Sequence, residues 1–326
     1  MNTFFLIIGI VLVIAAIADF IWTTLWVDGG AGPLTDRLSS ALWAFMRKWS
    51  RDHPKILSLA GPIILSATLL MWIFLLWAGW TLVFSGNESA IVNSTDSTPA
   101  TWVERLYYAG YLIFTLGNGD YAPTTGVWQI ATVIATGTGM MFITLGVTYL
   151  LSVLGAVTLK RAFAESVLSI GSSAEEIVTD SWDGNDFHNV NLLLSSFSSQ
   201  LSTITSQHSA YPILHYYYAE KHQESVPVAV IVLDEALTVF RFGIPEEHRP
   251  NGLLIKEMRR TTQSYLETMD ISAGTLPPPP DLVKLHAAGL PTVSAGEFSD
   301  ALGQLAERRK QLTGLAHASA VEAPWK

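Results

Sequence analysis

The 326-residue sequence has no cysteine and few charged side chains. The absence of cysteine excludes disulfide bonds, thiolate zinc sites and cysteine nucleophiles. Only 14% of the residues are Lys, Arg, Asp or Glu, whereas 49% are hydrophobic. This balance is too apolar for an ordinary soluble protein, and most of the apolar excess lies in the first half of the chain.

Three apolar runs are long enough to cross a bilayer, which requires about 20 residues. They cover residues 4–26, 56–84 and 126–159. From Lys160 onward the chain is polar and acidic, so neither nucleic acid nor anionic lipid is expected as the partner of this half. No Lys or Arg precedes the first run, which continues past a possible cleavage site at Ala18. We therefore expect a retained helix rather than a signal peptide.

The basic residues predict the orientation of these runs. Five of them lie in the link at residues 27–55, whereas the link between the second and third runs carries only Arg105. The positive-inside rule therefore places the first link and the C-terminal half in the cytoplasm, with the N-terminus outside a plasma membrane. The five residues are Arg37, Arg47, Lys48, Arg51 and Lys55.

The first link also contains an amphipathic pattern. From Leu34 to Trp49, apolar residues recur at helical spacing, and Arg47 and Lys48 end the segment on its polar side. We expect a helix that starts near Thr35, whose hydroxyl can cap it, and that lies in the inner membrane interface. A soluble helix packed on the cytosolic domain is the alternative.

Asp19 lies inside the first apolar run. Because an ionisable group within a membrane is costly, such a residue is a functional candidate by default. Asp19 is close to the inner end of its run, however, and the sequence favours a side chain that reaches headgroup water.

A further apolar segment, residues 101–114, is too short to cross a bilayer. The polar sequence TLGNGD follows it directly, at residues 115–120. Non-helical backbone at membrane depth is tolerated only where it is buried in protein or lines water. We therefore expect a re-entrant helix and an irregular segment that faces a wet pathway. The preceding residues, 85–100, show no periodicity and are expected to form a loop.

This order of elements resembles the pore of the potassium-channel superfamily, with its outer helix, pore helix, filter and inner helix. The family's filter motif, T-V/I-G-Y/F-G-D, aligns with residues 115–120, where Leu116 stands for Val or Ile and Asn118 replaces an aromatic residue. An aromatic pair begins at Tyr107, as in many pore helices, and Gly139 stands at the expected hinge of the inner helix. The resemblance covers about residues 56–158. The filter residues that it implies are Thr115, Leu116, Gly117, Asn118, Gly119 and Asp120.

The chemistry of cation binding agrees with this resemblance. A dehydrated cation needs oxygens in place of its water, and backbone carbonyls supply them when they point to one side. That alignment requires backbone angles that glycine adopts freely, hence Gly117 and Gly119, while Thr115 can add its hydroxyl. One loop per chain gives a quarter of such a ring. We therefore expect a homotetramer in the lipid bilayer, with K⁺ as the permeant ion and with no cofactor or metal site.

The departure at Asn118 predicts a weaker preference for K⁺ over Na⁺ than the family norm. In the family, the aromatic residue packs against the pore helix, and asparagine loses most of that contact. Its amide could compensate by hydrogen bonding to Tyr107, Tyr108 or Tyr111.

Family spacing from the hinge places four apolar residues of the third run toward the pore axis, where a constriction can close by dewetting. These inner-pore or gate residues are Met140, Ile143, Val147 and Leu151. Four threonines could line a wet cavity, but the sequence favours hydroxyls bonded to the preceding helical turn. They are Thr132, Thr136, Thr144 and Thr148.

The C-terminal half is predicted to be mostly helical, with a stiff break at residues 276–281 (LPPPPD). Residues 226–240 fit either a strand followed by a helix or one buried helix. His208, His215 and His222 are interpreted as solvated surface. The expected helices are residues 162–178, 190–205, 211–223, 253–269 and 296–315.

The sequence thus predicts an all-α membrane protein with three transmembrane helices, a re-entrant pore helix with its filter, and a mostly α cytoplasmic C-terminal domain. Its parts are an additional N-terminal helix (residues 1–26), a cytoplasmic link with the interfacial helix (27–55), a pore domain (56–159) and a cytoplasmic helical domain (160–326). We expect a tetrameric channel that passes K⁺, or monovalent cations with weak selectivity, and that its cytoplasmic domain gates or regulates through an unidentified ligand or protein. The alternative is a non-conducting scaffold or sensor with a degenerate pore. No arrangement of catalytic residues stands out, so no enzyme activity is expected.

Overall fold

The computed structural model describes two compact units of the chain. The N-terminal unit consists of Met1–Arg51, Leu59–Leu154 and Ala210–Tyr216, and the C-terminal unit consists of the remainder. Lys326, which the sequence places in the cytoplasm, lies outside the described residues. The residues described are 2–27, 29–49, 54–124, 126–269, 271–319, 321 and 324.

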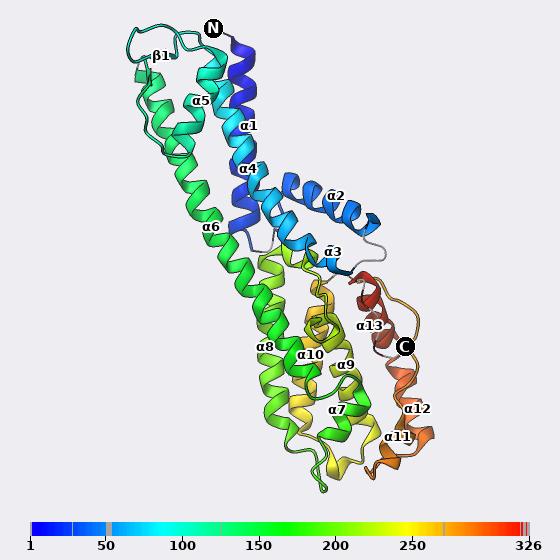
Figure 1. Ribbon diagram of the computed structural model, residues 1–326. Coiled ribbons are helices and arrows are strands. Elements are labelled where there is room, and N and C mark those ends of the chain that lie inside the picture. The colour runs from blue at the N-terminus through cyan, green and yellow to red at the C-terminus, as the bar shows by residue number, and fades with distance from the viewer. Residues whose placement is uncertain are drawn as a thin grey trace. The chain divides into compact units, whose positions relative to one another are not determined.

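Three of the described helices are long and apolar enough to cross a membrane, which confirms the predicted fold class. In the N-terminal unit, α1 (Thr3–Leu25) lies along α4 (Ala60–Ser85) (Figure 1). The two backbones approach so closely that a Cβ added at Gly9 would lie 2.7 Å from the carbonyl oxygen of Gly79. Small residues permit such contact between membrane helices, so these glycines let α1 pack directly on α4.

A short helix, α5 (Trp102–Ile113), stands between α4 and the long helix α6 (Gly126–Leu168). At its start, Glu104 accepts a hydrogen bond from the N–H of Thr101 at 2.6 Å. The boundary between the two units falls within α6, after Leu154. α6 extends beyond the predicted apolar run because its last turns are polar but still helical.

The link before α5 is not only a loop. Ile91–Asn93 forms strand β1, which pairs antiparallel with β2 (Tyr121–Pro123). The prediction of an unstructured link is therefore wrong for these residues. Three residues are too few to show an alternating pattern, and their pairing partner lies far along the sequence.

α2 (Pro33–Trp49) packs on α4, with Thr35 and Met46 buried. It leaves Phe45 and Trp49 exposed, and the centroids of their stacked rings are 6.3 Å apart. Thr35 does not cap the helix as predicted, because α2 begins at Pro33 and Thr35 already lies within its first turn.

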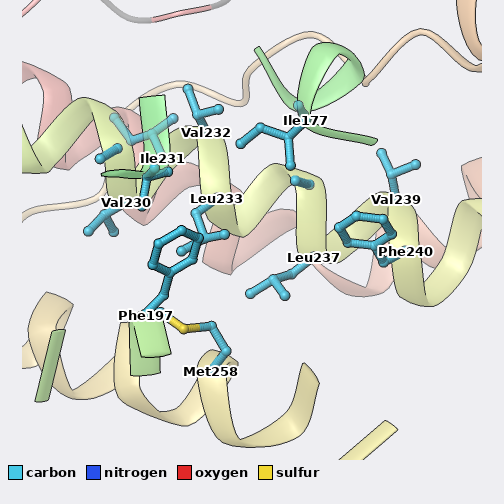
Figure 2. Packing of buried hydrophobic residues seen from close by; sticks show 14 of the residues in the cluster. Ile177, Phe197, Val230, Ile231, Val232, Leu233, Leu237, Val239, Phe240 and Met258 are labelled. Carbon is cyan, nitrogen blue, oxygen red and sulfur yellow. The ribbon is translucent and has the colours of Figure 1, made fainter. Parts of the chain in front are cut away.

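α9 (Val226–Thr238) is the centre of the C-terminal unit and is buried among other helices (Figure 2). Phe197 from α8 and Met258 from α10 pack in the same cluster. Of the two alternatives for this segment, one buried helix is correct, and it continues as a π-helical turn at Val239–Gly243. The unit's other α-helices are α3 (Pro54–Ser58), α7 (Ala174–Asp180), α8 (Val190–Ala210), α10 (Gly252–Thr268), α11 (Leu282–Ala287), α12 (Ala295–Gln304) and α13 (Ala306–Ala318).

The predicted helix at residues 211–223 is wrong. The segment contains only the 3₁₀ turns η1 (Pro212–Tyr216) and η2 (His222–Glu224), because Pro212 lacks the N–H that would continue α8. The three histidines therefore do not share a helix, and His208 is buried rather than solvated.

Two other predicted helices are interrupted. Residues 162–178 are broken between α6 and α7, where a Cβ added at Gly171 would lie 2.6 Å from the backbone nitrogen of Ile177. Residues 296–315 are divided at Leu305 between α12 and α13. In both cases the apolar spacing continues across a short break, so the sequence pattern alone does not reveal it.

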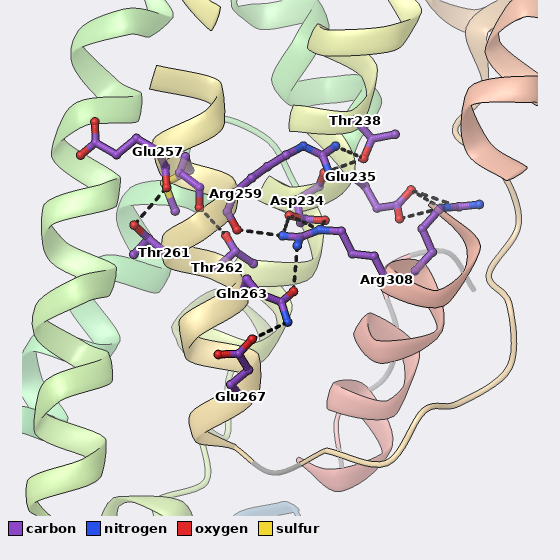
Figure 3. A network of polar contacts seen from close by, with 12 residues as sticks. Asp234, Glu235, Thr238, Glu257, Arg259, Thr261, Thr262, Gln263, Glu267 and Arg308 are labelled. Carbon is purple, nitrogen blue, oxygen red and sulfur yellow. Dashed lines mark hydrogen bonds and ion pairs between the residues drawn. The ribbon is translucent and has the colours of Figure 1, made fainter. Parts of the chain in front are cut away.

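A buried ion-pair network joins α13 to α9 (Figure 3). Arg308 Nη2 donates to Asp234 Oδ1 at 2.6 Å, and Arg309 Nε donates to Glu235 Oε1 at 2.9 Å. Burial alone would raise the pKa of Asp234, but Arg308 and Arg259 together hold that pKa below its usual value. Burial raises the pKa of Glu235, and Arg309 offsets this only in part. The two adjacent carboxyls therefore differ in how strongly their ionised forms are favoured.

Candidate ion-conducting site

The filter segment, residues 115–120, has no regular secondary structure and connects α5 to β2. Its φ angles are positive at every second residue: 54° at Thr115, 64° at Gly117 and 79° at Gly119. Successive carbonyls of an ordinary strand point to opposite sides, and an alternating sign of φ turns them toward one side. The segment therefore has the backbone form that a row of cation-binding carbonyls requires.

Thr115 is one of the residues that sets this backbone form. The sequence predicts Thr115 as a filter residue that adds its hydroxyl, and its φ is also positive, which is rare for a β-branched residue. Such strain persists only where neighbouring structure holds it. Here the N–H of Thr115 donates to Leu112 O at 3.1 Å, and that of Leu116 donates to Tyr111 O at 2.9 Å. Thr115 lies two residues before Gly117, just as Gly117 lies two residues before Gly119. This spacing is the sequence signal that could have identified the positive φ of Thr115.

Asn118 is connected to α5 by a relay of side chains. Its amide donates to the hydroxyl of Tyr107, and that hydroxyl donates to Asp120 Oδ2 at 3.0 Å. The hydrogen bond predicted for this amide is thus present, with Tyr107 as its partner, and whether it compensates for the missing aromatic ring stays a prediction. Tyr111 holds Tyr121, the residue that follows Asp120, because the hydroxyl of Tyr111 donates to the carbonyl of Tyr121 at 2.6 Å.

Ser94, in the link before α5, also holds the filter segment, and sequence reasoning missed it. Its Oγ donates to the carbonyl oxygen of Gly119 at 2.7 Å. No local pattern marks this serine, since the contact depends on the pairing of β1 with β2. The filter segment is thus supported both from α5 and from the link.

Gly139 lies where α6 passes the end of α5. A Cβ at this position would lie 2.5 Å from the carbonyl oxygen of Ile113, so glycine is needed for this close approach. α6 runs unbroken through Gly139, and a hinge there stays a prediction.

The four expected gate residues are exposed on α6 in the single chain. Exposure in a single chain does not distinguish a side chain that faces a pore, a neighbouring subunit or lipid, and the gate stays a prediction. Three of the four threonines make the bonds to the preceding helical turn that the sequence favours. The hydroxyls of Thr132, Thr136 and Thr148 donate to the carbonyls of Trp128, Thr132 and Thr144 at 2.8, 3.1 and 3.0 Å.

Three tryptophans of α4 connect it to the surrounding elements, a role that hydropathy does not reveal. The indole N–H groups of Trp77 and Trp80 donate to Leu106 O of α5 at 2.8 Å and to Thr138 Oγ1 of α6 at 3.1 Å. That of Trp72 donates to Asp19 Oδ2 of α1 at 2.8 Å. α4 therefore positions both helices that flank the filter segment.

Asp19 is 2% exposed and does not reach headgroup water, so the favoured interpretation is wrong. Its Oδ1 accepts from the N–H of Leu34 at 2.7 Å, and its Oδ2 accepts from the hydroxyl of Thr35 at 2.6 Å and from Trp72. A carboxylate is favourable at a helix start because the free N–H groups and the helix dipole attract negative charge. Asp19 therefore fixes the start of α2 between α1 and α4.

Residues 210–216, here called the tyrosine strap, belong to the N-terminal unit although the residues before and after them belong to the other. Tyr211 packs its ring against Tyr149 of α6, with centroids 5.9 Å apart. Tyr216 packs against Trp43 of α2 at 5.7 Å. The strap therefore contacts both α6 and α2.

Two hydrogen-bonded carboxylates lie near the start of α5, Asp96 in the link before it and Glu104 in its first turn. Hydrogen bonds from Thr98 lower the pKa of Asp96, and hydrogen bonds led by the backbone N–H of Thr101 lower that of Glu104. The lowered pKa values favour the ionised form of both groups.

Comparison with known proteins agrees with this geometry. Residues 69–156, which include most of α4, all of α5, the filter segment and much of α6, match a family model described as "Ion channel". The chain is 48% identical to the "Uncharacterized membrane protein YdjJ" of Bacillus subtilis (strain 168) over 328 residues, which cover 99% of this chain and 96% of that protein. No solved structure matches the chain.

Proposed function

The chain carries an ion channel domain at residues 69–156 and belongs to one family with the membrane protein YdjJ; from this premise we propose that four copies form a channel that conducts K⁺, with weak discrimination against Na⁺, across the plasma membrane. The observation that carries the proposal is the alternating φ of the filter segment at Thr115, Gly117 and Gly119. Aligned carbonyls can replace the water of a monovalent cation.

The tetramer follows from the supply of ligands. Each chain has one filter segment, and a coordination ring needs carbonyls from several sides. The exposed apolar stripe from Met140 to Leu151 supports a central position for α6, since a single chain leaves it uncovered. Val147 and Leu151 would close the pore by dewetting.

The weak discrimination follows from the bracing of the filter segment. Asn118 is held through one hydroxyl, that of Tyr107, where an aromatic ring would add packing area. A looser support allows the carbonyls to adjust to a smaller ion. Because 1.4 kcal/mol is about a tenfold change in preference, a small loosening is sufficient.

The gating proposal rests on the tyrosine strap. Its contact between Tyr211 and Tyr149 touches the helix that carries the proposed gate, and the strap is continuous on both sides with the C-terminal unit. A ligand or protein that alters the C-terminal unit would change this contact.

We propose further that the N-terminus lies outside and that α2 lies in the inner interface. The N–H of Asn2 donates to Gly86 O at 2.7 Å, so the start of α1 and the outer link share one end of the unit. The exposed pair Phe45 and Trp49 beside Arg47 suits a boundary between lipid and water.

The test is ion flux through the purified full-length protein in liposomes, followed by reversal potentials under bi-ionic K⁺/Na⁺ conditions. Unitary current steps and a modest K⁺ preference are expected, and Asn118→Tyr should increase that preference. Absence of flux would favour a scaffold or sensor, and saturable uptake without unitary steps would favour a transporter subunit. Strong K⁺ selectivity that Asn118→Tyr leaves unchanged would show that the Tyr107 relay braces the filter fully.

A further inference from the structure

Ser94 controls two successive carbonyl groups at the outer end of the filter segment. Its Oγ donates to Gly119 O at 2.7 Å, and its backbone N–H donates to Asp120 O at 2.9 Å. One residue of the link therefore fixes the orientation of both peptide groups.

The position of Ser94 is set in advance by the structure around it. The pairing of Asn93 with Tyr121 ends the β1–β2 ladder and leaves Ser94 opposite Asp120. Asn93 also closes a tight turn, because its Oδ1 accepts from the N–H of Thr95 at 2.8 Å. The hydroxyl of Ser94 is thus presented to the filter segment by ordered backbone on both sides.

In the part of the chain that the structure describes, the carbonyl of Gly119 accepts no hydrogen bond besides that from Ser94. Its φ of 79° is freely available to glycine, and an added Cβ would meet no atom within 4 Å. The direction of its carbonyl therefore depends on its hydrogen-bond partner rather than on packing. An oxygen that accepts a hydroxyl hydrogen also offers less negative potential to a cation.

We propose that Ser94 is a selectivity-determining positioning residue, which holds the carbonyl of Gly119 out of the row of ion-binding oxygens. The inference rests on the proposed function of the filter segment. With this carbonyl withdrawn, the outermost ion is coordinated partly by water. Where selectivity depends on the number and field of the carbonyl ligands, one ring fewer lowers the preference for K⁺. Ser94 and Asn118 then act in the same direction.

The experiment compares bi-ionic K⁺/Na⁺ reversal potentials of the full-length protein with those of Ser94→Ala and Ser94→Thr. The alanine variant frees the Gly119 carbonyl, which a cation on the axis attracts, so the K⁺/Na⁺ permeability ratio should rise about threefold to tenfold, the worth of one neutral hydrogen bond. The threonine variant keeps the hydroxyl and should keep the wild-type ratio. Thr95→Ala is the matched control, because the hydrogen bond of Thr95 to Asn93 uses its backbone N–H.

A ratio that is unchanged or lower in Ser94→Ala, or an equal rise in Thr95→Ala, would overturn the proposal. If the alanine variant does not assemble, Ser94→Cys replaces it, because a thiol is a weaker donor of nearly the same size and should give a smaller rise. K⁺ affinity of the detergent-solubilised protein, measured by calorimetry, separates this inference from the proposed function. Wild type without current refutes the channel, whereas equal K⁺ affinities of wild type and Ser94→Ala refute the role of Ser94.

Discussion

Replacing Asp19 with alanine should destabilise the N-terminal unit more than any surface substitution. The carboxylate joins three helices: α1, which carries it, α2, whose first turn it caps, and α4, whose Trp72 donates to it at 2.8 Å. Alanine leaves these donors without their acceptor and opens a small cavity beside Gly32, whose added Cβ would lie 2.4 Å from Asp19 Oδ1.

The size of the effect follows from the donors that remain. A buried donor left without a partner costs about 1–3 kcal/mol, and bonds to charged groups lie at the upper end. The hydroxyl of Thr35 can rotate to another acceptor, but the indole of Trp72 cannot. Removing the anion from the first turn of α2 costs about 0.3–1 kcal/mol more. The alanine variant no longer buries a charged group, which offsets part of this destabilisation. We therefore expect the free energy of unfolding to fall by about 3 kcal/mol.

The assay is thermal unfolding of the purified full-length protein in detergent. A loss of this size should lower the melting temperature by roughly 6–10 °C. Asp19→Asn keeps one carbonyl acceptor and should lose about half as much. Asp36→Ala is the control, because Asp36 lies in the same first turn of α2 but is exposed.

The reasoning would be refuted if Asp19→Ala melted no lower than Asp36→Ala. An Asp19→Asn variant as unstable as Asp19→Ala would show that the negative charge, rather than the number of acceptors, holds α2. An unchanged melting temperature with altered ion flux would place Asp19 in conduction instead of assembly.

Three further predictions concern the gate, the C-terminal unit and the topology. Leu151→Asp should wet the constriction and raise basal flux, and wild-type flux from an intact tetramer would place the gate elsewhere. Asp234→Asn should cost about 3–5 kcal/mol and more than Glu235→Gln, because burial already favours the neutral form of Glu235. The pKa of Asp234 is lowered in the folded protein, so its ionised form contributes to the free energy of unfolding above the unfolded-state pKa. This contribution is lost as the pH falls through the folded-state pKa. Equal melting temperatures of the two variants at neutral pH would contradict the prediction. Cysteines introduced at Thr3 and Lys326 into this cysteine-free chain should label from outside only at Thr3, and native mass spectrometry should give four chains; a labelled tail or a dimer would exclude the model.

The parts of the fold that the sequence predicts are those with local signals. Apolar length marks the three spans, and the shortness of residues 101–114 marks α5. Glycine spacing marks the filter segment before any contact is known. Ser94 and the tyrosine strap could not be found in this way, because each depends on residues far apart in the sequence that meet only in the folded unit.

Burial on all sides explains the main ambiguity of the C-terminal half. α9 is buried around its whole circumference and begins with a continuous apolar run, so no periodicity distinguishes a helix from a strand there. Its two acidic residues, Asp234 and Glu235, suggest a solvated end, but Arg308 and Arg309 neutralise them in the interior. A pairing between α9 and α13 cannot be read from either segment alone.

The family match begins at Leu69, within α4, but α4 is also held by residues of α1, which lie much earlier in the chain. From one end to the other, α1 meets α4 through Asn2 with Gly86, Gly9 with Gly79, and Asp19 with Trp72. These pairs run in opposite directions along the two helices, so α1 supports α4 over nearly its full length. The last pair also fixes the start of α2, whose far end packs on the tyrosine strap through Trp43. A change in the strap can therefore reach α4 through α2 and Asp19 as well as through α6. This chain of contacts would extend the proposed gating to α1, which lies outside the family match.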